Sequence, residues 1–265
     1  MYQLPLGVSI AAKKDDFYQK IDEAKSLGFD SVDFDLTVGG YYNGDDEIEE
    51  LKKRAAYLKA SGLRFNGVHI PYGAYWDIST KDDGDRTRNL DNIKKAIAWL
   101  DAFQLFCYIL HGSSGPIMDK DRDWRIENLI VSVKELEAYT KTPIAVENLP
   151  RTCLLSTTKE WLAVAKKLKK RDFCLDVNHF LQEYSHEAVK KIGRRFITTH
   201  ISDHDYVNER HWMPKKGKID WMQLIGVFEK IGYQGVFNYE LVGEFTLADV
   251  KDNYVRLFEN YNAIR

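Results

Sequence analysis

The chain has 265 residues, of which 44% are hydrophobic and 29% charged, and its net charge at pH 7 is −2. This balance is typical of a soluble globular protein and excludes a disordered chain, and the near-neutral charge gives no global reason to bind nucleic acid tightly. No apolar run is long enough to cross a membrane, and the N-terminus has no basic stretch followed by apolar residues. We therefore expect a cytoplasmic protein with no membrane partner.

The three cysteines are Cys107, Cys153 and Cys174. They are odd in number and show no Cys-x-x-Cys spacing, so the sequence indicates neither a disulfide framework nor a thiolate zinc site. Buried free thiols are the expectation.

One pattern repeats along the chain: a short β-branched or aromatic run, a loop with Gly, Asp or His, and then an amphipathic helix. Strands are predicted at residues 8–10, 31–36, 64–70, 107–110, 143–146, 173–175, 196–199 and 235–239. Helices are predicted from the apolar positions of residues 17–27, 48–58, 90–100, 126–136, 161–168, 187–192, 222–231 and 247–261.

Strands that alternate with helices require a parallel sheet, and eight such units allow the sheet to close. The sequence thus predicts the α/β class and one (β/α)8 TIM barrel of eight parallel strands, spanning residues 1–265 as a single domain. An open, doubly wound sheet is the rival architecture. It is disfavoured because no Gly-x-Gly-x-x-Gly follows the first predicted strand.

Histidines and acids collect where the predicted strands end, which is where a barrel of this kind places its catalytic groups. Five of the seven histidines lie at or just beyond such ends: His69, His111, His179, His200 and His211. Three acids directly follow apolar strands: Glu147, Asp176 and Glu240. Burying these carboxylates costs several kcal/mol unless a cation or hydrogen bonds compensate. Together the residues predict a divalent metal site, with Mn, Mg, Co or Zn (or Fe) as candidates.

Each of these residues, taken alone, also has a structural explanation. A single strand-end histidine is most often hydrogen-bonded within the fold, and a single acid can cap the following helix. The metal site is predicted from their conjunction, which Glu209 joins on the same face.

The chain resembles the xylose-isomerase-like barrel superfamily, and in particular its sugar phosphate isomerase/epimerase group. The resemblance spans nearly the whole chain and is carried by residues 27–33 (LGFDSVD), 67–72 (GVHIPY), 145–148 (AVEN), 176–179 (DVNH), 200–203 (HISD), 217–221 (GKIDW) and 232–235 (GYQG). It implies that one metal is held by Glu147, Asp176, His200 and Glu240. It also implies proton transfer through an enediolate, with Glu147 and Glu240 as acid and base.

The related zinc-dependent apurinic/apyrimidinic endonucleases share this barrel and use further ligands. The resemblance places these additional metal or substrate ligands on His69, His111, His179, Glu209 and His211. Glu209 stands where that family has Asp. The loop at residues 214–217 (PKKG) departs from the family's Gly-Glu-Gly, which leaves the contacts of that loop open.

The substrate expected from these features is a sugar, sugar phosphate or polyol. Tyr72, Trp76 and Trp212 are candidates for an apolar wall and Lys216 for a phosphate contact, against the alternatives of loop packing and solvent exposure. An inosose dehydratase-like lyase or a multi-zinc nuclease is the alternative function. The loops at 37–46 and 71–85 are acidic and aromatic, which disfavours a nucleic-acid partner. Assembly as a homo-oligomer is left open.

Overall fold

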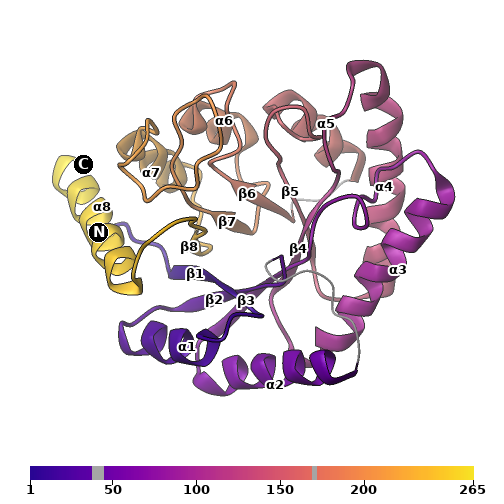
Figure 1. The fold of residues 1–265 in the computed structure, drawn as a ribbon. Helices are drawn as coiled ribbons and strands as arrows, with labels where there is room; N and C mark the ends of the chain where they lie inside the picture. Colours follow the sequence, from indigo (N-terminus) through magenta and orange to yellow (C-terminus); the bar gives the residue numbers. More distant parts are fainter. Residues whose placement is uncertain (38–44, 169–171) are drawn as a thin grey trace.

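A computed structural model describes residues 1–37, 45–168 and 172–265, and in it the strands form the centre of a ring of helices (Figure 1). The eight strands pair in the order β7-β6-β5-β4-β3-β2-β1-β8, and every pairing is parallel. They are β1 (Leu6–Ala11), β2 (Ser31–Asp35), β3 (Arg64–His69), β4 (Cys107–His111), β5 (Ile144–Glu147), β6 (Phe173–Asp176), β7 (Thr198–His200) and β8 (Phe237–Tyr239).

The sheet closes between β7 and β8 through a short parallel bridge. The backbone N–H of Ile201 donates to the carbonyl of Asn238 at 2.8 Å, and the N–H of Glu240 donates to the carbonyl of Ile201 at 3.2 Å. Closure brings the C-terminal ends of all eight strands to one end of the barrel, here called the mouth. The prediction of a (β/α)8 barrel rather than an open sheet is confirmed.

A helix follows each strand and packs outside the barrel (Figure 1). The helices are α1 (Phe17–Ser26), α2 (Asp45–Ser61), α3 (Asp83–Leu100), α4 (Arg122–Tyr139), α5 (Thr158–Leu168), α6 (Ser185–Ile192), α7 (Trp221–Lys230) and α8 (Leu247–Ile264), with short 3-10 turns at Asp101–Phe103 and Asp119–Asp121. Among the described residues, none of these helices combines the length and apolar character needed to cross a bilayer.

Helix α8 illustrates how local sequence sets an element. Thr246 and Asp249 form a capping box, in which each side chain accepts the other residue's backbone N–H, so the helix begins at Leu247. Its buried stripe then packs inward, and the N-terminus lies beside its far end, where the N–H of Tyr2 donates to Asn262 at 2.9 Å. The last helix thereby holds the N-terminal segment that leads into β1.

The predicted strands coincide with the observed ones to within one or two residues at most ends. The seventh is shifted: the sequence predicts 196–199, whereas β7 runs from Thr198 to His200. The N–H of Ile197 already donates to the carbonyl of Phe173, so the chain joins β6 there before the regular ladder begins. As predicted, Cys107 and Cys174 are buried free thiols, while Cys153 is only half-buried.

Candidate metal centre

Four side chains from four strands converge at the mouth. Glu147 ends β5, Asp176 ends β6, His200 ends β7 and Glu240 directly follows β8. One ligand atom from each lies within 4.8 Å of those of the other three. The first three are fully buried, whereas the Glu240 side chain keeps 20% of its surface exposed. The strand-end placement expected from the sequence therefore does bring these four residues together.

Glu147 lies at the centre of three imidazoles. Its Oε1 is 2.6 Å from Nδ1 of His200, and its Oε2 is 3.2 Å from Nε2 of His69 and 3.1 Å from Nε2 of His111. Burial alone would raise the pKa of this carboxyl, but the charge of His200 and the three imidazole hydrogen bonds lower it well below its usual range. Glu147 is thus ionised at neutral pH.

Asp176 and Glu240 are shifted in the opposite direction. Burial, reinforced by the negative charge of Glu147, raises the pKa of both carboxyls, that of Asp176 to well above its ordinary value. Oδ1 of Asp176 accepts the N–H of Asn178, but its buried Oδ2 has no hydrogen-bond partner among the described residues. Nε2 of His179 lies 3.4 Å from this oxygen, which belongs to a group of donors that could hold a cation.

Three acids with imidazole nitrogen and an orphaned carboxylate oxygen fit a divalent ion. Oxygen and nitrogen donors of this kind suit Mg, Mn, Co or Zn. A dication would offset the repulsion that raises the pKa of Asp176 and Glu240. On the chemistry of its donors, the cluster of Glu147, Asp176, His200 and Glu240 is therefore a candidate metal centre.

Four of the five additional residues border this centre. His69 and His111 form a ligand-like group with Glu147, and His179 and His211 form another with Asp176. Nδ1 of His69 lies 2.9 Å from the carbonyl of Ile70, which leaves its Nε2 facing the acids. Nδ1 of His179 is likewise 2.8 Å from the carbonyl of Asn148, with Nε2 at 3.4 Å from Asp176.

Three of these imidazoles, those of His69, His111 and His211, differ in how they hold a proton. Burial opposes a charge on His69, but Glu147 outweighs it and raises the pKa of His69 to about 9. Burial dominates at His111 and lowers its pKa to about 4, and it also lowers that of His211. His111 and His211 are consequently neutral at pH 7, the state in which an imidazole binds a metal or accepts a hydroxyl proton.

Glu209 does not join these groups. Its carboxylate forms an ion pair with Arg151, and its other oxygen is buried without a hydrogen-bond partner among the described residues. Within the part of the chain that the structure describes, no candidate ligand cluster includes Glu209.

The predicted substrate-contacting residues lie in different settings. Tyr72 is 60% exposed and stacks on His111, with ring centroids 4.8 Å apart and planes 16° from parallel. Trp212 is at the surface under the Arg210 guanidinium. Trp76 is buried in the hydrophobic core, and Lys216 is exposed.

The strand-end pattern does not single out Asp33 or Asp203, yet both are fully buried. Asp203 organises the β7–α7 loop by accepting the indole N–H of Trp221 and backbone N–H groups, among them those of Lys215 and Ile219. Asp33 lies inside the barrel, 3.4 Å from Nε2 of His200. Besides its place at the end of the LGFDSVD segment, the signal for Asp33 in the sequence is an acid flanked by apolar residues in the middle of a strand.

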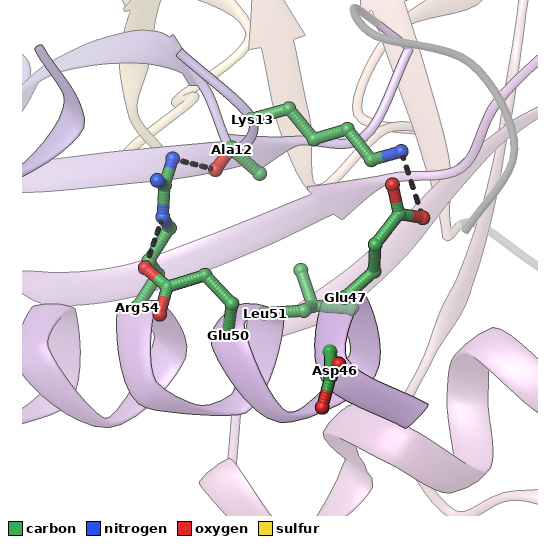
Figure 2. Close-up of a pocket in the computed structure, with 7 residues that line it drawn as sticks. All are labelled: Ala12, Lys13, Asp46, Glu47, Glu50, Leu51 and Arg54. Carbon is green, nitrogen blue, oxygen red and sulfur yellow. Dashed lines mark hydrogen bonds and ion pairs between the residues drawn. The ribbon is translucent and has the colours of Figure 1, made fainter. Parts of the chain in front are cut away.

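A hollow of about 310 Å³ lies on the flank of the barrel, between the loop after β1 and helix α2 (Figure 2). Four of its five charged side chains already pair with one another. Lys13 contacts Glu47 at 3.4 Å, and Arg54 bonds both Glu50 and the carbonyl of Ala12. The contacts of Lys13 and of the Ala12 carbonyl join α2 to the loop after β1, which is a structural role.

Residues 21–255 match the family model described as xylose isomerase-like TIM barrel. No curated protein matches the sequence significantly. Among solved structures, a D-tagatose 3-epimerase-like protein has a TM-score of 0.76 at 18% identity, over 98% of this chain and 99% of that one.

Two further solved structures are similar over almost their whole length. The 3-keto-D-glucoside 4-epimerase of E. coli gives a TM-score of 0.74 at 20% identity, over 97% of this chain and 100% of the other. D-Psicose 3-epimerase from Clostridium cellulolyticum H10, solved with D-tagatose, gives 0.75 at 18% identity, over 98% and 99%. At such identities the likeness shows a shared fold.

Proposed function

Because the chain belongs to the xylose isomerase-like TIM barrel family, we propose that it is a divalent-metal-dependent isomerase or epimerase of a sugar, sugar phosphate or polyol. The observation that carries this proposal is the convergence of Glu147 and Glu240 on one imidazole. Their carboxylates lie 2.6 Å and 3.5 Å from Nδ1 of His200 and come from separate strands. Sugar epimerases among the solved structures of the same fold support the choice of substrate class.

The two glutamates have the properties of a base and an acid. Glu147 is ionised and accepts the proton that leaves the carbon beside the substrate carbonyl. Glu240, whose pKa is raised by burial and by the charge of Glu147, binds a proton more readily than Glu147 does and returns one to the opposite face of that carbon. A pair of carboxyls with pKa values driven apart is the arrangement that proton transfer in both directions requires.

Glu147, Asp176, His200 and Glu240 are the proposed metal ligands. A bound dication would polarise the substrate carbonyl and stabilise the negative charge that develops on its oxygen. The protein side chains supply the rest: His179 and His211, which lie near Asp176, hold substrate hydroxyls or a further metal. Tyr72, stacked on His111, covers one side of the mouth.

A nuclease with several metals is the alternative, and the two histidine groups beside the centre are the feature in its favour. The position of Glu209 argues against it, because Arg151 neutralises this carboxylate outside the clusters. The start of α3 also offers no excess positive charge to a phosphate backbone, because Asp83 and Asp85 pair there with Arg86 and Arg88, and Asp82 lies beside them. Residues 38–44 of the other acidic loop lie outside the described residues.

The test is a screen of ketoses, their phosphates and inosose-type ketones in heavy water, with each metal added to chelator-stripped protein. We expect metal-dependent exchange of a carbon-bound proton with at least one ketose or ketose phosphate. Loss of water from an inosose would identify the lyase instead. Zinc-stimulated nicking of an abasic duplex, with no exchange in any sugar, would refute the proposal in favour of the nuclease.

A further inference from the structure

A layer of polar side chains crosses the inside of the barrel one step below the metal centre. Thr198 and Asn238 lie two residues before His200 and Glu240 on their strands, and therefore point to the same side of the sheet as they do. The layer comes from five strands and consists of Ser9, Asp33, Asn66, Thr198 and Asn238.

Asp33 is the charged member of this layer. Its Oδ1 accepts the side-chain amide of Asn66 at 2.6 Å, and its Oδ2 accepts that of Asn238 at 3.0 Å. The second amide proton of Asn66 reaches the hydroxyl of Thr198, so the amide is fixed in this orientation. Two amides from two other strands thus hold both carboxylate oxygens in place.

The strand register and a glycine on β3 leave space for the carboxylate of Asp33. The pairing of β2 with β3 changes register between Val32 and Asp33, which brings Asp33 opposite Gly67. A Cβ at position 67 would lie 3.0 Å from Oδ1 of Asp33 and 2.8 Å from the side chain of Ile109. Only a residue without a side chain leaves this space open.

A fully buried carboxylate is costly, and two amide hydrogen bonds compensate only in part. The remaining neighbour of Asp33 is His200, whose Nε2 is 3.4 Å from Oδ2. That nitrogen is buried, and among the described residues it forms no hydrogen bond shorter or better aligned than this contact with Asp33. The other nitrogen, Nδ1, faces Glu147 and Glu240. The imidazole of His200 therefore lies between the carboxylate of Asp33 inside the barrel and the carboxylates of Glu147 and Glu240 at the mouth.

We propose that Asp33 is a positioning residue of the metal centre: it accepts the Nε2–H of His200 and so fixes the tautomer in which Nδ1 binds the metal. Metal-ligating histidines generally donate their second ring N–H to a carboxylate or carbonyl, and losing that partner weakens metal binding about 10- to 100-fold. This inference rests on the metal centre of the proposed function, and it adds a residue outside the ligand set.

The variant test compares Asp33→Asn with Thr198→Val. Both substitutions disturb the polar layer. Asp33→Asn removes the carboxylate that faces His200, whereas Thr198→Val removes only a hydroxyl and keeps the shape of the side chain. Metal affinity is measured by competition with a chromophoric chelator, and the visible spectrum of the Co²⁺ form reports the ligand field. We expect Asp33→Asn to weaken binding about 10- to 100-fold and to shift the spectrum, and Thr198→Val to stay within about threefold of wild type.

Equal affinities for wild type and Asp33→Asn would overturn the proposal, as would an equal loss in both variants. A second measurement needs no variant: ¹⁵N spectra of the Zn²⁺-loaded wild type should show His200 protonated at Nε2 and bound through Nδ1. Zinc on Nε2 would overturn the inference even if Asp33→Asn does not fold. Wild-type protein that binds no divalent metal would refute the proposed function too, whereas metal-dependent turnover with an unchanged Asp33→Asn affinity would refute the role of Asp33 alone.

Discussion

Glu147 and Glu240 face the same nitrogen of His200, yet their surroundings drive the two pKa values apart. Glu147 is buried among three imidazoles and is held ionised, whereas burial and the charge of Glu147 raise the pKa of Glu240. The pair is therefore asymmetric before any substrate arrives. Glu147 is held ready to accept a proton, and Glu240 binds a proton more readily than an exposed glutamate does.

Removing either carboxylate should slow proton transfer strongly. We expect Glu147→Gln and Glu240→Gln each to lower kcat about 10²- to 10⁴-fold, the usual contribution of a positioned acid or base. The measurement is solvent-proton exchange into a ketose substrate. Glu127→Gln is the control, since Glu127 lies on the outside of α4 and pairs with Lys167. Undiminished exchange in both active-site variants would disprove the acid and base assignment.

Asp176→Asn should separate metal binding from stability. A raised pKa means that folding disfavours the ionised carboxyl, so the neutral amide should leave the metal-free protein at least as stable as wild type. The same change removes a proposed ligand. We expect metal at 100 times its Kd to raise the Tm of wild type by roughly 5 to 10 °C and that of the variant by much less. Equal metal-induced shifts would exclude Asp176 as a ligand.

His204 should make the metal-free protein sensitive to acid. It is fully buried, and its Nδ1 accepts the backbone N–H of Tyr206, so burial lowers its pKa from 6.5 to about 4. Between these values the unfolded chain binds more protons. The contribution to stability is therefore complete above pH 6.5 and falls by about 3 kcal/mol as the pH drops to 4.

Urea unfolding at several pH values tests this expectation. His204→Asn keeps an acceptor for the Tyr206 N–H but does not titrate, so its stability relative to wild type should improve as the pH falls from 6.5 to 4. His186→Asn, which removes an imidazole from α6, is the matched control. Parallel pH profiles for wild type and His204→Asn would contradict the prediction.

Replacing Gly217 and Gly226 by alanine should change the free energy of unfolding in opposite directions. A Cβ at Gly217 would lie 2.3 Å from Oδ1 of Asp203 and 2.4 Å from the carbonyl of His204, so Gly217→Ala should cost about 1 to 3 kcal/mol. Gly226 lies within α7, where an added Cβ would come no closer than 3.4 Å to Tyr261. There alanine should stabilise by up to about 1 kcal/mol, because glycine weakens a helix. Thermal unfolding of both variants measures the difference.

The barrel and the convergence of its acids were predictable because both follow from periodicity. A strand that alternates with a helix fixes the direction of the next strand, and an acid at the end of each strand then falls at the mouth. Glu147, Asp176 and Glu240 needed no further information. The three-residue β7 was displaced, since its start depends on the pairing of Ile197 with Phe173 rather than on its own composition.

Contacts between distant side chains were not predictable in the same way. Glu209 looked like a ligand by position, but it pairs with Arg151, which lies 58 residues earlier in the chain. Trp76 lies in a loop whose packing buries it, and nothing in its neighbours along the chain distinguishes it from the exposed Tyr72. The position of the Asp33 side chain inside the barrel depends on a change of register between β2 and β3. The alternation of hydrophobic and polar residues along a strand does not reveal such a change.

The tight fit between Gly67 and Asp33 has a consequence for the evolution of this chain. With only 3.0 Å between the carboxylate and any Cβ at position 67, neither residue can change alone without strain or an empty space. The two positions should therefore covary among relatives together with position 109, so that lineages that lose the aspartate and shorten the side chain of Ile109 can acquire a side chain at position 67. Such paired substitutions would identify relatives in which Nε2 of His200 no longer faces a carboxylate.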